Sequence, residues 1–184
     1  MVREFSKKIK IIDFEKNCGQ TAAFDAGFNL STGEIVITMD ADLQNDPKDI
    51  PLLLKKTEEY DLICGWRHKR EDSFIKKVSS RVANWVRNKI SGESIQDTGC
   101  SLKVFRKEVL KHLKLFTGMH RFFPTLAKME GYRVIEVKVN HRPRIHGKSK
   151  YNIHNRIIKS FLDLLAVRWM KNRRLDYKVK EIIQ

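Results

Sequence analysis

The sequence predicts an α/β fold in which a mostly parallel sheet, flanked by helices, carries an acidic site at one edge. Two observations support this prediction. Strand-like and helix-like segments alternate through residues 8–65, and an apolar run ends directly in two carboxylates, Asp40 and Asp42. The chain has 184 residues, of which 41% are hydrophobic and 32% charged. That balance indicates a folded domain with its own core.

The first half of the chain gives the clearest pattern. We expect strands at residues 8–13, 34–39 and 61–65, separated by helices at residues 17–30 and 47–60. The strand at 34–39 has almost no polar interruption, which is typical of a central strand. In parallel sheets, ligands bind at the carboxyl ends of the strands, and Asp40 and Asp42 follow such an end.

The second half is less regular, and we interpret it as more helical. Residues 1–151 are expected to form the α/β domain and residues 152–184 an amphipathic helical tail. The further predicted elements are helices at 74–90, 107–115, 122–130 and 152–174 and strands at 101–105 and 132–139.

The acidic run Asp40-Ala41-Asp42-Leu43-Gln44 predicts a divalent-cation site. Two acids at positions i and i+2 point the same way on an extended backbone, and Gln44 adds a third oxygen. Such oxygens suit Mg²⁺ or Mn²⁺, which usually share their ligands with substrate phosphates. The simpler interpretation is a solvated loop in which Asp46 caps a helix beginning at Pro47.

Positive charge is concentrated after this acidic site. The formal net charge is +15, but residues 1–60 carry −3 and residues 61–184 carry +18. The second half is therefore expected to bind an anion, which could be nucleotide phosphate, lipid phosphate or nucleic acid. We find no nucleic-acid-binding motif and no aromatic stacking platform, which disfavours nucleic acid.

Five short motifs, in order, resemble the inverting, metal-dependent family 2 glycosyltransferases with the GT-A fold, and within them the polyprenyl-phosphate (dolichol-phosphate-mannose-synthase-like) branch. In that family a nucleotide-binding strand and turn precede the first of these motifs, so the resemblance implies a domain lacking about its first quarter. The motifs are Asn17-Cys18-Gly19-Gln20 with Ala23, Asp40 to Pro47, Gly65 with Arg67, Asp97 to Lys103, and Gly147 to Tyr151.

The resemblance implies a role for each group of candidate residues. Asp40, Asp42 and Gln44 would hold the metal that stabilises the leaving diphosphate, and Asp97 is the candidate general base. Asp97 could equally be a turn residue. A basic loop would contact the donor phosphates, and arginines would bind the acceptor phosphate. The donor-phosphate candidates are Arg144, Ser149 and Lys150, and the acceptor candidates are Arg67, Arg70 and Arg121.

The last helix predicts contact with a membrane surface. Ile153, Ile157, Phe161, Leu164 and Leu165 share one side, and basic residues flank it. Such a helix suits an anionic lipid surface, although it could instead pack on the sheet or in a dimer.

We therefore expect a cytoplasmic enzyme, peripheral at the membrane, that moves a sugar from a nucleotide-sugar to a lipid phosphate. The cytoplasmic expectation follows from three cysteines without a metal or disulfide pattern, from the absence of a run long enough to span a membrane and from a charged beginning unlike a signal peptide. A glycan acceptor, a catalytically incompetent truncated relative and a nucleic-acid-binding module are the alternatives.

Overall fold

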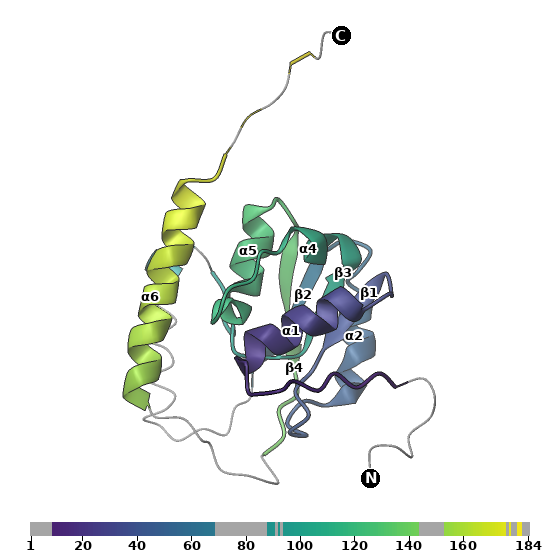
Figure 1. Cartoon of the computed structure of the whole chain (residues 1–184). Coiled ribbons are helices and arrows are strands. Elements are labelled where there is room, and N and C mark those ends of the chain that lie inside the picture. The colour runs from purple at the N-terminus through teal and green to yellow at the C-terminus, as the bar shows by residue number, and fades with distance from the viewer. Residues whose placement is uncertain are drawn as a thin grey trace.

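The computed structural model describes residues 9–68, 88–90, 92, 94–143, 153–175, 177 and 180–181, with backbone only for 153–158. Its centre is a four-stranded sheet in the order β1-β3-β2-β4 (Figure 1). The strands are β1 (Ile35–Thr38), β2 (Leu62–Arg67), β3 (Lys103–Arg106) and β4 (Val134–Val139).

Strand direction largely agrees with the sequence prediction, because three of the four strands in the described part of the chain run the same way. β2 and β4 pair in parallel, whereas β3 is antiparallel to both β1 and β2. The sheet is therefore mixed, with β3 as the reversed strand. The prediction that residues 34–39 form a central strand was wrong, because within the described part of the chain β1 pairs only with β3. Apolar patterning reports burial, and it carries no information on direction or strand order.

Helices cover both faces of the sheet. One face carries α1 (Gly19–Leu30), α4 (Lys107–His112) and α5 (Phe123–Met129). They enclose a core of Phe28, Leu62, Phe105, Val109 and Phe123. The opposite face is covered by the 3₁₀ turn η2 (Pro47–Asp49) and α2 (Ile50–Leu54). Alternate residues of β2 and β3 face the two cores, as the pleat of a strand requires.

Several elements differ in length or in type from the sequence prediction. Of the strand predicted at 8–13, the described residues 9–13 form no strand, and Ile9, Ile11 and Ile12 are exposed. The helix predicted at 47–60 shortens to η2 and α2. There the capping interpretation is confirmed, because the Asp46 side chain accepts a hydrogen bond from the Lys48 backbone N–H. The predicted helix at 74–90 lies outside the described residues except for 88–90, which are helical.

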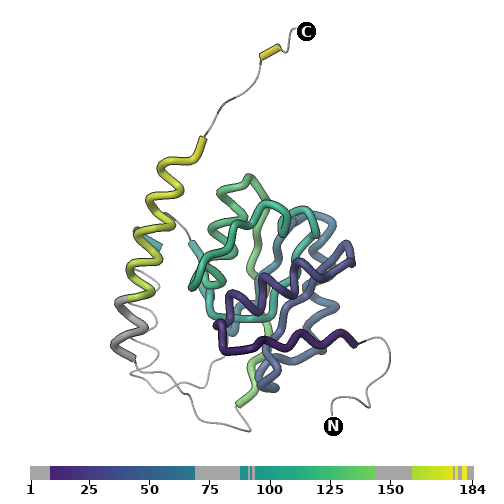
Figure 2. Tube along the Cα trace, viewed as in Figure 1, coloured from purple at the N-terminus to yellow at the C-terminus, as the bar shows by residue number. Residues whose placement is uncertain are grey.

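The long helix α6 (Ile153–Asn172) runs beside α5 (Figures 1 and 2). Leu164 and Val167 pack against Phe122 and Leu126, which belong to the 3₁₀ turn η3 (Met119–Phe122) and to α5. Only part of the apolar side predicted for this helix is buried, since Leu164 packs inward whereas Phe161 and Leu165 are exposed.

Candidate functional site

Five of the predicted site residues lie at one edge of the sheet: Asp40, Asp42, Gln44, Arg67 and Asp97. Strands β1, β2 and β4 all run in the same direction, because β3 is antiparallel to β1 and to β2 while β4 is parallel to β2. Their carboxyl ends therefore meet at one edge, together with the beginning of β3. Asp40 and Asp42 follow β1, Arg67 ends β2, and Asp97 lies in the loop that leads into β3.

Residues 40–46 form an acidic turn after β1. Leu43 has a φ of 63°, a left-handed conformation that is rare for a residue with a Cβ. This conformation folds the chain back, so that the Gln44 backbone N–H donates to Asp42 Oδ1 at 3.2 Å. Ser101 anchors both ends of the turn, because its Oγ accepts from the Asp40 backbone N–H at 3.0 Å and from Asn45 Nδ2 at 2.8 Å.

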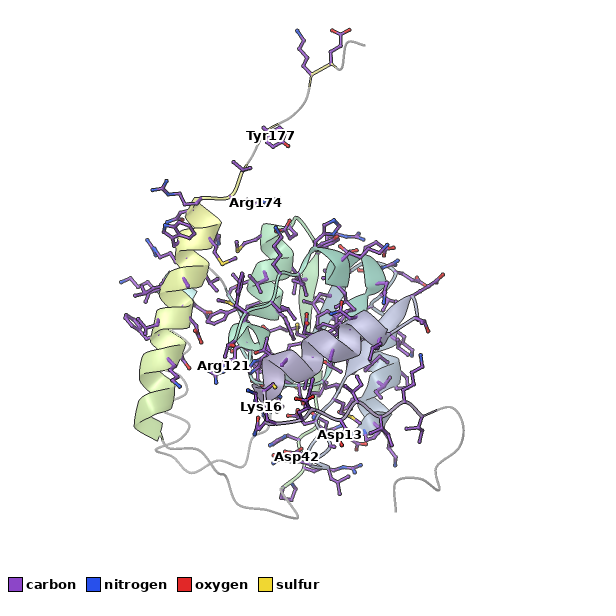
Figure 3. The ribbon with its side chains drawn as sticks, in the orientation of Figure 1. Asp13, Lys16, Asp42, Arg121, Arg174 and Tyr177 are labelled. Atoms are coloured by element: carbon purple, nitrogen blue, oxygen red, sulfur yellow. The ribbon has the colours of Figure 1, made fainter. Side chains whose placement is uncertain are left out.

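The beginning of α1 reaches this turn. Gln20 Nε2 donates to Asp40 Oδ1 at 3.2 Å, which ties the first turn of the helix to the first carboxylate. In Figure 3, Asp42 lies toward the same end of the molecule as Lys16 and Asp13, which precede α1, whereas Arg174 and Tyr177 lie beyond the far end of α6.

The donor set of the acidic turn fits a hard divalent cation. Two carboxylates and one amide are oxygen ligands, and Mg²⁺ or Mn²⁺ completes such a partial set with substrate phosphate and water. Within the described ranges no group of three or more His, Cys, Asp or Glu side chains could hold a metal. Asp40, Asp42 and Gln44 are the residues of this turn that could hold such an ion.

Arg67 and Asp97 form a bidentate ion pair beside the acidic turn. Arg67 Nε and Nη2 donate to the two carboxylate oxygens of Asp97 at 2.7 and 2.8 Å. The backbone N–H of Arg67 and of Gly99 also donate to this carboxylate. Asp97 is only 7% exposed. A carboxylate held in this way fixes the direction in which the guanidinium points, which is an orienting role.

Glu136 supports this pair, and the sequence analysis did not single it out. Its carboxylate accepts from the backbone N–H of Gln96 and of Asp97, both at 2.8 Å. The sequence carried no signal for this role, because Glu136 takes an ordinary polar position in the alternating run from Ile135 to Val139. Lys103, itself buried, donates to the Cys100 carbonyl and so holds the other end of the same loop.

The cysteines do not take part in this chemistry. Burial raises the pKa of Cys64 to about 12 and also raises the pKa of Cys100. Both therefore stay thiols at neutral pH, whereas Cys18 is exposed.

Arg121 lies in η3, which packs against the beginning of α1 and faces α6. Its Nη1 donates to Ser160 Oγ. Nearby, burial raises the pKa of Asp163, and the positive charge of Arg121 partly offsets that rise. Four further candidates lie outside the described residues: Arg70, Arg144, Ser149 and Lys150.

Comparison with known sequences decides the family. The profile of the family described as "Glycosyl transferase family 2" matches residues 1–114, which is more than half of the chain. The chain belongs to glycosyl transferase family 2. The resemblance to family 2 noted in the sequence is thereby confirmed.

Two relatives refine this assignment. The chain is 43% identical over 164 residues to a dodecaprenyl-phosphate galacturonate synthase of Rhizobium johnstonii, covering 86% of this chain and 48% of that protein. It is 36% identical over 160 residues to an undecaprenyl-phosphate 4-deoxy-4-formamido-L-arabinose transferase of Edwardsiella ictaluri, covering 86% and 49%. The chain thus spans about half the length of the curated relatives it matches.

Solved structures confirm the GT-A fold. Glucosyl-3-phosphoglycerate synthase from Mycobacterium tuberculosis, in complex with Mn²⁺, UDP and glucosyl-3-phosphoglycerate, matches with a TM-score of 0.62 and 15% identity. The match covers 86% of this chain and 56% of that one. The same enzyme with Mg²⁺ and UDP matches with a TM-score of 0.61 and 14% identity.

Proposed function

We propose that this family 2 chain transfers a sugar from a nucleotide-sugar to a polyprenyl phosphate, with a divalent cation and with inversion at the anomeric carbon. The observation that carries the proposal is the meeting, at one sheet edge, of the acidic turn after β1 with the Arg67–Asp97 pair after β2. One half of this edge suits a cation, and the other suits an anion. The two curated relatives, which are named as polyprenyl-phosphate sugar transferases, support the choice of acceptor.

The acidic turn would act on the donor. Breaking the bond between the sugar and the diphosphate leaves extra negative charge on the leaving group, and Mg²⁺ or Mn²⁺ supplies the charge that stabilises it. Asp40, Asp42 and Gln44 would hold the ion. The Mn²⁺ and Mg²⁺ complexes of the mycobacterial enzyme support the choice of metal.

Arg67 would bind the acceptor phosphate. An ionised phosphate oxygen at neutral pH is already a nucleophile, so transfer to it needs no general base. Asp97 then acts by orienting the Arg67 guanidinium, which agrees with the engagement of both its carboxylate oxygens. Attack by this oxygen from the side opposite the leaving diphosphate gives inversion in a single displacement.

We further propose that α6 contacts an anionic membrane surface. Its outward side exposes Phe161, Leu162, Leu165 and Trp169, the last of which is 64% exposed. Exposed basic residues surround this side, among them Lys159, Arg168, Lys171, Arg173 and Arg174. Apolar side chains with a tryptophan and basic flanks match an interfacial helix on anionic lipid. No described helix is long and apolar enough to cross a membrane.

Calorimetric titration tests the proposal. We expect UDP- or GDP-sugars to bind in the presence of Mn²⁺ and to lose at least about tenfold in affinity on Asp42→Ala, since a metal ligand is removed. Asp25→Asn, which changes an exposed acid in α1, is the matched control and should leave the affinity unchanged. Binding that is independent of metal and of Asp42 would refute the cation site.

Acceptor choice is tested by transfer of radiolabelled sugar to undecaprenyl phosphate or to a soluble glycan. Labelling of the glycan alone would favour the alternative acceptor. Binding of nucleic acid in place of nucleotide-sugar, lost with rising salt and indifferent to Mn²⁺, would favour the nucleic-acid alternative.

A further inference from the structure

A set of contacts attaches the acidic turn to the residues that follow β4. We call it the interlock, and it consists of Gln44, Asp46 and Asp49 on one side and Asn140 and Arg142 on the other. The Asp49 carboxylate, 7% exposed, accepts from the Asn140 backbone N–H at 2.8 Å and from Asn140 Nδ2 at 2.9 Å. Residues more than 90 apart in sequence are thereby held together.

The second contact of the interlock involves Gln44 directly. The Arg142 backbone N–H donates to the Gln44 carbonyl at 2.9 Å, and Gln44 Nε2 donates to the Arg142 carbonyl at 3.4 Å. The bridge between Asn45 and His141 lies between this contact and the Asp49 contact. An amide whose nitrogen is directed to a carbonyl has its oxygen in a defined orientation, and an amide oxygen is the atom that a hard cation takes.

The third contact is an ion pair. Arg142 Nη2 lies 2.7 Å from Asp46 Oδ2. The Asp46 carboxylate also caps η2, because its Oδ1 accepts from the Lys48 backbone N–H at 3.0 Å. Asp46 thus holds Arg142 against the end of the acidic turn.

We propose that Asp49, Asn140 and Arg142 are positioning residues for the cation site: through the interlock they hold the acidic turn, and the Gln44 amide within it, in the geometry that binds a divalent ion. This inference rests on the proposed function, because it needs Asp40, Asp42 and Gln44 to be the cation site. It adds Asp49 of η2 and two residues that follow β4, which supply no ligand, to the machinery of that site.

The sign of the charge effect makes the inference testable. Arg142 is a positive charge near a site for a positive ion, so Arg142→Gln removes a repulsion and would strengthen Mn²⁺ binding if charge alone mattered. A positioning role predicts the reverse. We expect Arg142→Gln to weaken binding of Mn²⁺ about threefold to tenfold, which is at or below the lower end of the range for residues that orient metal ligands.

Asn140 gives a second test with the same logic and a rescue. Asn140→Asp places a carboxylate against Asp49, and it should weaken Mn²⁺ binding although it adds negative charge near the site. The exchange of both residues, Asp49→Asn with Asn140→Asp, restores one amide opposite one carboxylate and should recover most of the affinity.

The measurement is the electron paramagnetic resonance signal of free Mn²⁺, titrated against the whole chain with and without UDP. The matched control is Arg133→Gln. Arg133 forms a comparable ion pair with Asp61, in which Nε and Oδ2 are 3.3 Å apart. Both residues lie just before β4 and β2, at the ends of these strands away from the cation site. Arg133→Gln should leave Mn²⁺ affinity unchanged. Thermal unfolding of each variant shows whether it is folded at the assay temperature.

The outcomes separate the two proposals. Weaker binding in Arg142→Gln and Asn140→Asp, with recovery in the exchanged pair, supports the interlock. Unchanged or tighter binding in folded Arg142→Gln, while Asp42→Ala abolishes binding, overturns the interlock and leaves the proposed function intact. Absence of Mn²⁺ binding by the wild-type chain, with and without UDP, overturns the cation site and the interlock's role with it.

Discussion

Gly65 is the position at which one added methyl group should disturb the sheet beneath the site. It lies in β2, two residues before Arg67, where the strand passes close to the loop that carries Asp97. A Cβ at this position would lie 2.9 Å from Cys100 Sγ, 3.0 Å from the Leu102 carbonyl oxygen and 3.1 Å from Val139 Cγ2. The Leu102 carbonyl cannot retreat freely, because it accepts the Gly65 backbone N–H at 2.9 Å.

The cost of Gly65→Ala follows from these contacts. Overpacking a close-packed core by one carbon costs about 1–3 kcal/mol, and three simultaneous contacts favour the upper half of that range. Loss of unfolded-state entropy returns about 0.4–1 kcal/mol to the folded state. We therefore expect a net loss of about 1–2 kcal/mol in the free energy of unfolding.

Gly27→Ala is the matched control, because it should have the opposite sign. Gly27 lies inside α1, and a Cβ there would meet nothing within 4 Å. Alanine is the better helix former by roughly 0.5–1 kcal/mol, so this variant should be more stable than the wild type.

Urea unfolding followed by circular dichroism checks both variants. With a slope of about 2 kcal/mol/M, the midpoint should fall by about 0.5–1 M for Gly65→Ala and rise by about 0.3–0.5 M for Gly27→Ala. A midpoint for Gly65→Ala at or above that of the wild type would refute the close approach of β2 to the Cys100–Leu102 segment.

Three further predictions concern titratable groups. The pKa of Asp46 is lowered in the folded protein. The free energy of unfolding in urea should therefore be larger for wild type than for Asp46→Asn at about pH 6. This difference should disappear as the pH falls from the ordinary pKa of 3.8 through the folded pKa. The pKa of Asp163 is raised, so its ionised carboxylate destabilises the folded protein. Asp163→Asn should therefore raise the melting temperature, measured by calorimetry, by about 1–2 °C near neutral pH. No gain is expected below pH 3.8, where the carboxyl group is protonated in the folded and in the unfolded protein. Thiol titration of the native chain at neutral pH should detect Cys18 alone, with Cys64 and Cys100 reacting only in denaturant; rapid native reaction of a second thiol would contradict their burial.

Local patterns predicted most of the elements correctly. The helix at α1 and the strands β2, β3 and β4 follow from apolar periodicity within each segment. The cap at Asp46 followed from proline and aspartate at adjacent positions. The prediction at residues 8–13 was wrong because alternation describes a surface that could pair, whereas a strand also needs a neighbour with an open edge.

The candidate site also contains residues that a local pattern predicts and residues whose role depends on a distant segment. Asp40, Asp42 and Gln44 were predicted because a local run places them at alternate positions directly after an apolar segment. Glu136, Asp49 and their partners could not be predicted in this way, because each acts on a segment 39 or 91 residues away. The residue types carry no signal for such pairings, which arise only when strands lie in register.

The sequence by itself determined the family, the acidic turn and the identity of the charged residues, since these depend on residue types at short spacing. Tertiary structure decided the strand order β1-β3-β2-β4, the antiparallel course of β3 and the pairing of Arg67 with Asp97. It also decided which side of α6 is exposed, because Leu164 and Val167 find partners on α5 and η3 whereas Trp169 does not face them. The physical reason is that hydrogen bonding and burial along one segment are local, whereas direction, register and packing partners depend on which distant segments meet.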